Sequence, residues 1–209
     1  MEKVIVFVDY ANINRSAQDV GIDIDYGSLL GYLADPNEGR FLQEAFAYVP
    51  VDPRQDHAMD QKIQELWDQG FVVKPKVGTI AGQTYKCDFD VEITLDMVRA
   101  AFDMNPDIVV LVSGDSDFVP VVLELRGKGI RVEVASFGRS MSGLLRHRCS
   151  GYINLDLFAD DSGSWDDDGW DGRAEHATFA ESTEPGSEPF AAYDVGDVVD
   201  ASYEIPETR

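Results

Sequence analysis

Two aspartates, Asp115 and Asp117, follow an unbroken run of apolar residues, Ile108–Val112, after a short Ser-Gly link. A run without alternation predicts a strand that is covered on both faces, as in a parallel sheet. A helix is predicted to follow, from about Ser116 to Lys128. Ligands of such sheets bind at the carboxyl ends of the strands. Two acids side by side there repel each other unless a positive charge lies between them, and a divalent metal ion is the simplest candidate.

More polar side chains are predicted to reach the same edge of the sheet. The first apolar run, Val4–Val8, ends at Asp9, and Asn12 follows one helical turn later. A later helix carries Asp90 in its first turn. If the strands are ordered 3-2-1-4-5, the strand that ends at Asp9 lies beside the strand that precedes Asp115. The acids then meet where the strand order reverses, which is the expected ligand site.

Four carboxylates would meet at this edge: Asp9, Asp90, Asp115 and Asp117. Oxygen ligands without His or Cys suit Mg²⁺ or Mn²⁺. Such ions can activate water and stabilise the leaving oxygen in phosphodiester cleavage. For any single aspartate the simpler interpretation is a helix cap or a turn residue, and we favour it for Asp88, at or near the N-cap of the helix that carries Asp90. For Asp96, further along that helix, both interpretations stay open.

Strands that alternate with helices predict an α/β domain with a mainly parallel sheet of five or six strands. The strands are expected over residues 4–8, 43–49, 71–75, 108–112 and 130–135, with a short last one over 152–158. The helices are expected over about 13–20, 25–33, 54–69, 88–105, 116–128 and 140–148. Residues 77–85 are expected to form a loop or hairpin. Alternation places strand 130–135 toward an edge, and Trp67 is expected in the core.

The negative charge of the chain is concentrated in its C-terminal part. Of 209 residues, 39 are acidic and 17 are Lys or Arg, for a formal net charge of −22. The segment from Ala159 onward has 15 of these acids and two arginines, which gives −13. It has no sustained hydrophobic period, so we predict a disordered acidic tail, 159–209, after a folded domain, 1–158. Strong negative charge disfavours nucleic acid, so binding of nucleic acid would require local basic side chains.

The sequence predicts a cytoplasmic protein that does not enter a membrane. Its two cysteines, Cys87 and Cys149, form neither a disulfide framework nor a zinc motif, and they fit a reducing compartment. The apolar run Val4–Val8 is too short for a signal peptide. No run approaches the ~20 apolar residues that span a membrane.

Three segments together resemble the signatures of the NYN domain: Val6–Ile13, Lys86–Val98 and Val112–Val121. The resemblance covers about residues 1–155 and is greatest to the LabA-like branch of this PIN-like nuclease superfamily. It implies a Rossmann-like three-layer α/β/α sandwich (the PIN-like fold) and a metal-dependent ribonuclease. By position, the acidic metal site of the family matches Asp9, Asp90, Asp115 and Asp117.

Further family positions imply residues that support the site. Asn12 matches the amide after the first acid, Asp96 matches a further acid, and Ser113 lies within the third signature. The middle signature departs from the family at Cys87, where glycine is usual, and adds the acid Asp88. Family members also often carry an aspartate in the segment that here is 148–152, so a supporting contact can differ.

Single-stranded RNA is the substrate that the resemblance implies, and its phosphates need basic partners. Candidates near the strand ends are Arg15, Lys74, Lys76 and Lys86. The acidic tail can compete with RNA or dock on a protein partner through its aromatic residues. Deleting it should then raise RNA affinity at low salt. The sequence also leaves a homo-oligomer open.

The sequence therefore leaves two functions open. The complete acid set favours a ribonuclease, most simply an endoribonuclease, that uses Mg²⁺ or Mn²⁺. The strong negative charge and the aromatic residues of the tail favour a non-catalytic or weakly active regulatory module that acts through RNA or protein binding.

Overall fold

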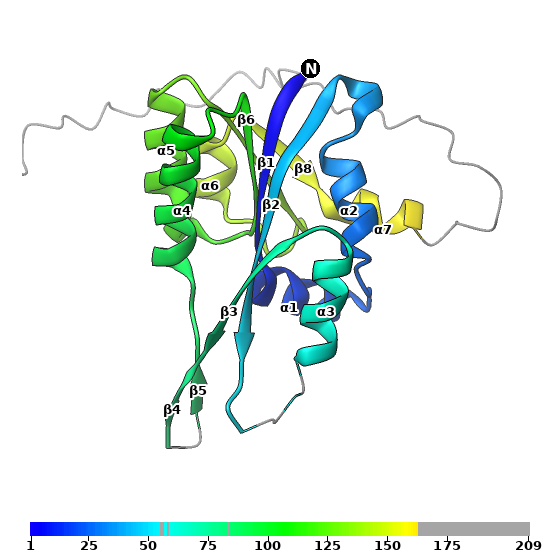
Figure 1. Ribbon diagram of the computed structural model, residues 1–209, viewed down its shortest axis with the longest axis vertical. Coiled ribbons are helices and arrows are strands. Elements are labelled where there is room, and N and C mark those ends of the chain that lie inside the picture. The colour runs from blue at the N-terminus through cyan, green and yellow to red at the C-terminus, as the bar shows by residue number, and fades with distance from the viewer. Residues whose placement is uncertain (55–56, 58, 83, 163–209) are drawn as a thin grey trace, which may run out of the picture. The chain divides into compact units, whose positions relative to one another are not determined.

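A six-stranded sheet forms the centre of the protein in a computed structural model, which describes residues 1–54, 57, 59–82 and 84–162 (Figure 1). The predictions for the acidic tail from residue 163 onward lie outside the described residues. The strand order is β3-β2-β1-β6-β7-β8, and every neighbouring pair is parallel. The strands are β1 (Glu2–Asp9), β2 (Arg40–Val51), β3 (Val72–Val77), β6 (Ile108–Val112), β7 (Arg131–Ser136) and β8 (Gly151–Asn154). The order 3-2-1-4-5, which was assumed and not predicted from the sequence, is the order observed, with a sixth strand added.

Helices cover both faces of this sheet. One layer contains α1 (Tyr10–Val20), α2 (Tyr26–Leu33), α3 (Asp60–Asp68) and α7 (Leu155–Ser162), and the other contains α4 (Asp90–Asp103), α5 (Val119–Gly127) and α6 (Gly143–Arg148) (Figure 1). Short 3₁₀ helices are η1 (Pro36–Glu38) and η2 (Ser116–Phe118). The predicted hairpin consists of β4 (Thr79–Ala81) and β5 (Thr84–Lys86), which pair antiparallel.

Alternate side chains of β1 enter two separate cores, because successive residues of a strand point to opposite faces. Val4, Val6 and Val8 pack with the α1 layer, whereas Ile5 and Phe7 pack with the α4 layer. The neighbouring strand β6 is equally buried along its whole length. The absence of alternation in these two runs therefore correctly predicted central strands, and the three-layer α/β/α sandwich is confirmed.

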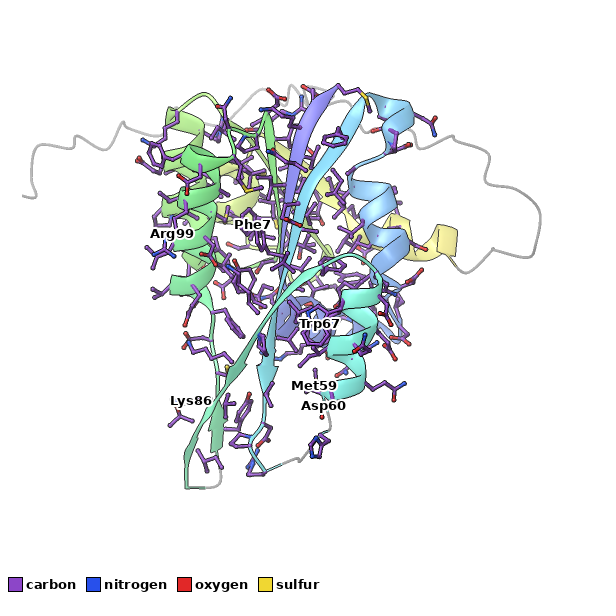
Figure 2. All side chains as sticks on the ribbon, viewed as in Figure 1. Phe7, Met59, Asp60, Trp67, Lys86 and Arg99 are labelled. Atoms are coloured by element: carbon purple, nitrogen blue, oxygen red, sulfur yellow. The ribbon has the colours of Figure 1, made fainter. Side chains whose placement is uncertain are left out.

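Two local predictions are wrong, and a third holds only in part. The last strand ends at Asn154, whose side-chain oxygen accepts a hydrogen bond from the Asp156 N–H at 3.2 Å and so favours the start of α7. Strand β7 lies toward an edge of the sheet, as predicted, but β8 pairs with it as the edge strand, and five of its six residues are buried. Trp67 is 51% exposed, since Ile63 and Leu66 already supply the buried face of α3 (Figure 2). None of the helices within the described ranges is long and apolar enough to cross a membrane.

Candidate active site

Four polar side chains form a row across the sheet at the level where β1 and β6 end. The strand register pairs Asp9 with Tyr48, and Tyr48 with Lys74. On the other side of β1, Val8 pairs with Val112, so Asp9 and the next residue of β6, Ser113, leave the sheet together. The row is Lys74, Tyr48, Asp9 and Ser113.

Asp9 is the anchor of this row, since it is only 8% exposed. It lies at the N-cap of α1, where its side chain accepts a hydrogen bond from the Asn12 N–H at 3.2 Å. The Ser113 hydroxyl donates a second hydrogen bond, also 3.2 Å long. Burial raises the pKa of Asp9 above its usual value even though both of these donors, and the nearby charge of Arg15, act to lower it. Asp9 is therefore fixed in position by its neighbours, at an electrostatic cost.

The turn after β6 is held by its neighbours on both sides. The Asn12 side-chain oxygen accepts a hydrogen bond from the Gly114 N–H at 3.1 Å, and the Gly114 carbonyl accepts one from the Ser142 N–H at 2.9 Å. A Cβ atom on residue 114 would lie 2.2 Å from the Ser140 carbonyl oxygen. Only glycine fits this close approach of two backbones.

Asp115 and Asp117 begin the helical segment after that turn. Asp115 is the N-cap of η2, and its carboxylate accepts a hydrogen bond from the Asp117 N–H at 3.0 Å. The Asp115 N–H in turn donates to the Ser113 hydroxyl at 3.3 Å. Ser113 thus contacts both Asp9 and Asp115, which makes it a link between the two acid-bearing strand ends.

Asp90 brings the third segment of the chain to the site. It is the first residue of α4. Burial, followed by the negative charges of Asp115 and Asp9 and the smaller influence of Asp88 and Asp117, raises the pKa of Asp90 from 3.8 to about 6. The predicted acids Asp9, Asp90, Asp115 and Asp117 are therefore close enough to repel one another. We refer to these four residues as the acid cluster.

The four carboxylates of the acid cluster do not converge on a common point. Within the described part of the chain, no three carboxylate, His or Cys side chains converge closely enough to hold a metal ion as they stand. The donor chemistry nevertheless suits a hard divalent cation, because all four groups are carboxylates that repel one another.

Asp96 has other partners than the acid cluster. Its carboxylate accepts hydrogen bonds from the Tyr48 hydroxyl at 2.8 Å and from Lys74 Nζ at 2.6 Å. Burial opposes its ionisation, but these two donors outweigh burial, so the pKa of Asp96 lies below its usual value. The sequence did not identify Tyr48 as a site residue. Its position near the end of the predicted strand 43–49 could have indicated that role. Asp96 with Tyr48 and Lys74 braces α4 against β2 and β3.

The prediction that Asp88 caps α4 is wrong. The N-cap residue is Phe89, and no side chain caps this helix by a hydrogen bond. Phe89 is 5% exposed, and its ring packs edge-on against Tyr48 with the ring centres 5.6 Å apart. Anchoring of Phe89 in the core fixes where the helix starts and leaves Asp88 exposed.

The four basic residues predicted for RNA contact fall into two pairs. Lys74 is bound to Asp96, and Lys76 forms an ion pair with Glu92 at 2.5 Å. Arg15 and Lys86 are exposed, and neither forms an ion pair within the described residues. Lys86 lies on the β4–β5 hairpin (Figure 2), whereas Arg15 lies near enough to Asp9 to lower its pKa. Arg15 and Lys86 are thus the bases that remain available to a ligand.

The three-layer sandwich is the fold that the resemblance to the PIN-like nuclease superfamily implies. The chain belongs to the NYN domain family of this superfamily, since the family model matches residues 3–156. It is similar to the low amplitude and bright protein LabA of Synechococcus elongatus, with 27% identity over 161 residues, which cover 73% of this chain and 83% of LabA.

The chain is similar to two further proteins. The uncharacterized protein MJ0482 of Methanocaldococcus jannaschii is 33% identical over 78 residues, which cover 37% of this chain and 29% of that protein. The crystal structure of VPA0982, a protein of unknown function from Vibrio parahaemolyticus, matches with a TM-score of 0.62 and 27% identity. That match covers 74% of this chain and 93% of VPA0982.

Proposed function

We propose that this chain is a metal-dependent endoribonuclease that hydrolyses single-stranded RNA at the acid cluster. The observation that carries the proposal is that three helical segments begin at the same site and bring Asp9, Asp90, Asp115 and Asp117 near one another. The raised pKa of Asp90 agrees with this crowding. Carboxylates crowded at a sheet edge weaken the fold, and such crowding is typical of sites that bind a cation or exchange protons. Membership in the PIN-like superfamily supports nuclease chemistry in general.

The proposed metal is Mg²⁺ or Mn²⁺, held by Asp9, Asp90, Asp115 and Asp117. When bound, such an ion supplies Lewis acidity to a phosphate and to the attacking water. The chain itself fixes Asp9 and Asp115 in advance through Ser113. Asn12 holds the turn at Gly114 through its side-chain oxygen and can offer only its NH₂ group to an RNA phosphate. Asp90 loses its proton near neutral pH, where a cation can take the place of that proton.

RNA would approach along the carboxyl edge of the sheet. Of the four predicted bases, Arg15 and Lys86 are exposed and have no ion pair within the described residues, so they can contact its phosphates. Lys74 and Lys76 would first have to leave Asp96 and Glu92, so their contribution should be smaller. The cytoplasm is the proposed compartment, and it is supported by the free thiols of the two cysteines. Within this proposal the tail after Ser162 regulates the folded domain.

The test is cleavage of a labelled single-stranded RNA with Mn²⁺, Mg²⁺ or EDTA. Wild type is compared with Asp115→Asn/Asp117→Asn and with Asp19→Asn/Asp23→Asn, which removes the same charge from exposed positions. We expect metal-dependent cleavage that only the first double variant loses. Cleavage that persists in that variant would reject the acid cluster as its source.

The alternative is a regulatory module that binds RNA or protein without cleaving RNA. Two observations favour it: half of the candidate bases are engaged in ion pairs, and the acids are not gathered into a metal-binding group within the described residues. If folded wild type binds the RNA in the presence of Mn²⁺ but does not cleave it, this alternative is the correct one.

A further inference from the structure

The outer face of α4 carries an exposed apolar stripe. Val91 is 65% exposed, Leu95 48% and Phe102 64%, and the partly buried Val98 lies between the last two. The stripe consists of these four residues, which are spaced by four, three and four positions. Single exposed apolar residues are common on protein surfaces, but a continuous stripe on one helix is not.

The stripe points away from the rest of the fold. The buried residues of α4 include Ile93, Met97 and Ala100, which lie on the opposite side of the helix. In Figure 1, α4 forms the outside of its layer, and Figure 2 shows Arg99 on that outer side. Apolar residues spaced by four and three positions are the pattern by which two helices pack side by side.

We propose that this stripe is a self-association surface, on which α4 of a second copy packs antiparallel. The spacing between the four residues of the stripe (four, three and four positions) is the same in both directions along the helix. A two-fold axis midway between Leu95 and Val98 therefore sets Val91 opposite Phe102 of the second copy, and Leu95 opposite its Val98. Self-complementarity of this kind is what a two-fold symmetric interface requires.

The charges beside the stripe favour the antiparallel arrangement. The Arg99 side chain is 68% exposed, and among the described residues its ion pair is a 3.5 Å contact with Asp96. In the antiparallel pair, Arg99 comes beside Glu92 of the second copy, and symmetry repeats this contact. A parallel pair would instead set Arg99 beside Thr94 of the second copy, which offers it no opposite charge.

The same charges argue against an anionic partner such as RNA or an acidic membrane. Acidic side chains flank the stripe at Asp88, Glu92, Asp96 and Asp103. Besides Arg99, the nearby basic residues are already paired: Lys128, 4.9 Å from the centre of the Phe102 ring, with Glu124, Lys76 with Glu92, and Lys74 with Asp96. A partner for this stripe should be a protein surface with an exposed arginine that can contact the acidic side chains. A second copy has such a residue in Arg99.

Sedimentation of the full chain tests the proposal with Val91→Glu and Phe102→Lys. Both positions are exposed, so folding should not suffer. We expect a wild-type dimer and a dissociation constant raised about 100-fold in each variant, because an unpaired charge is costly to bury. Mixing the two variants should restore the dimer, because antiparallel packing sets the new carboxylate at position 91 of one variant beside the new ammonium group at position 102 of the other.

The matched control is Leu157→Glu on α7, an exposed leucine of the other helix layer, which should leave the dimer unchanged. A monomeric wild type would overturn the proposal and leave segment 163–209 or another protein as the occupant of the stripe. A dimer that survives both charged variants would overturn it as well. Variants that dissociate but do not recover on mixing would exclude the antiparallel register.

Discussion

The Ser113 hydroxyl lies 3.2 Å from the Asp9 carboxylate and joins the ends of β6 and β1 by a buried hydrogen bond. It favours the charged form of Asp9. We expect Ser113→Ala to destabilise the protein by about 1–2 kcal/mol at neutral pH, because it removes this bond and the one that the hydroxyl accepts from the Asp115 N–H. The cost should shrink as the pH falls and Asp9 takes up a proton, because the lost bond acts on the carboxylate. Urea unfolding at neutral and acidic pH measures both effects.

The control for this variant is Ser150→Ala. The Ser150 hydroxyl accepts a hydrogen bond from the Val132 N–H at 3.1 Å, away from any acid of the cluster. Its loss should cost a similar amount at every pH. A pH-independent cost for Ser113→Ala would contradict the role assigned to that serine.

The raised pKa of Asp90 makes the acid cluster a source of pH-dependent stability. Between 3.8 and about 6, the folded chain holds more protons at Asp90 than the unfolded chain does. Stability contributed by this group therefore falls as the pH rises through that window. Asp90→Asn should raise the melting temperature by about 2–4 °C at slightly alkaline pH, the shift expected for ~1 kcal/mol after solvent screening. The gain should vanish in acid, below the usual pKa of an aspartate.

Thermal unfolding across this pH range measures the effect of Asp90→Asn. Asp19→Asn, on the exposed side of α1, is the control and should show no transition near the pKa of Asp90. A stabilisation that is the same at all pH values would mean that Asp90 is not in a crowd of negative charges.

Mn²⁺ should stabilise the folded protein through the acid cluster. A ligand that binds only the folded state at 100 times its dissociation constant adds ~2.7 kcal/mol, or roughly 5–10 °C in melting temperature for a chain of this size. The gain should be larger above the pKa of Asp90 than below it, because a proton there competes with the ion. Asp115→Asn/Asp117→Asn should lose the gain, whereas Asp19→Asn/Asp23→Asn should keep it. Equal gains in both double variants would place the ion elsewhere.

Asp96 should support the fold rather than bind the ion. Asp96→Asn weakens its contacts with Tyr48 and Lys74 and should cost about 2 kcal/mol at neutral pH. The pKa of Asp96 is lowered in the folded state, so this cost should disappear as the pH falls through that pKa. The variant should still be stabilised by Mn²⁺ to nearly the wild-type extent. Tyr48→Phe removes only the hydroxyl and should cost about half as much; loss of the Mn²⁺ effect in Asp96→Asn would instead make Asp96 a ligand.

The central strands could be predicted from the sequence because burial on both faces leaves a direct trace in residue type. The runs Val4–Val8 and Ile108–Val112 show it, and their ends located Asp9 and Asp115 correctly. The partners of Asp96 could not be predicted, because they depend on the register that sets Tyr48 beside Lys74. No local pattern encodes such a register.

Helix boundaries and exposure were harder to predict for a related reason. The prediction that Asp88 caps α4 failed because packing of Phe89 against Tyr48 sets the start of that helix. Trp67 has core spacing, yet the face of α3 that meets the sheet is filled without it. In both cases tertiary packing overrode a sound local preference.

The two strands that end at the acid cluster are also the two innermost strands of the sheet, and both are covered on both faces. Backbone amides in such strands exchange with solvent only when the whole domain opens. The amides of Val8 and Val112 should therefore be among the slowest to exchange deuterium. The carboxylates that repel one another are thus attached at the ends of the most stable strands. The acids therefore keep their positions for as long as the domain stays folded.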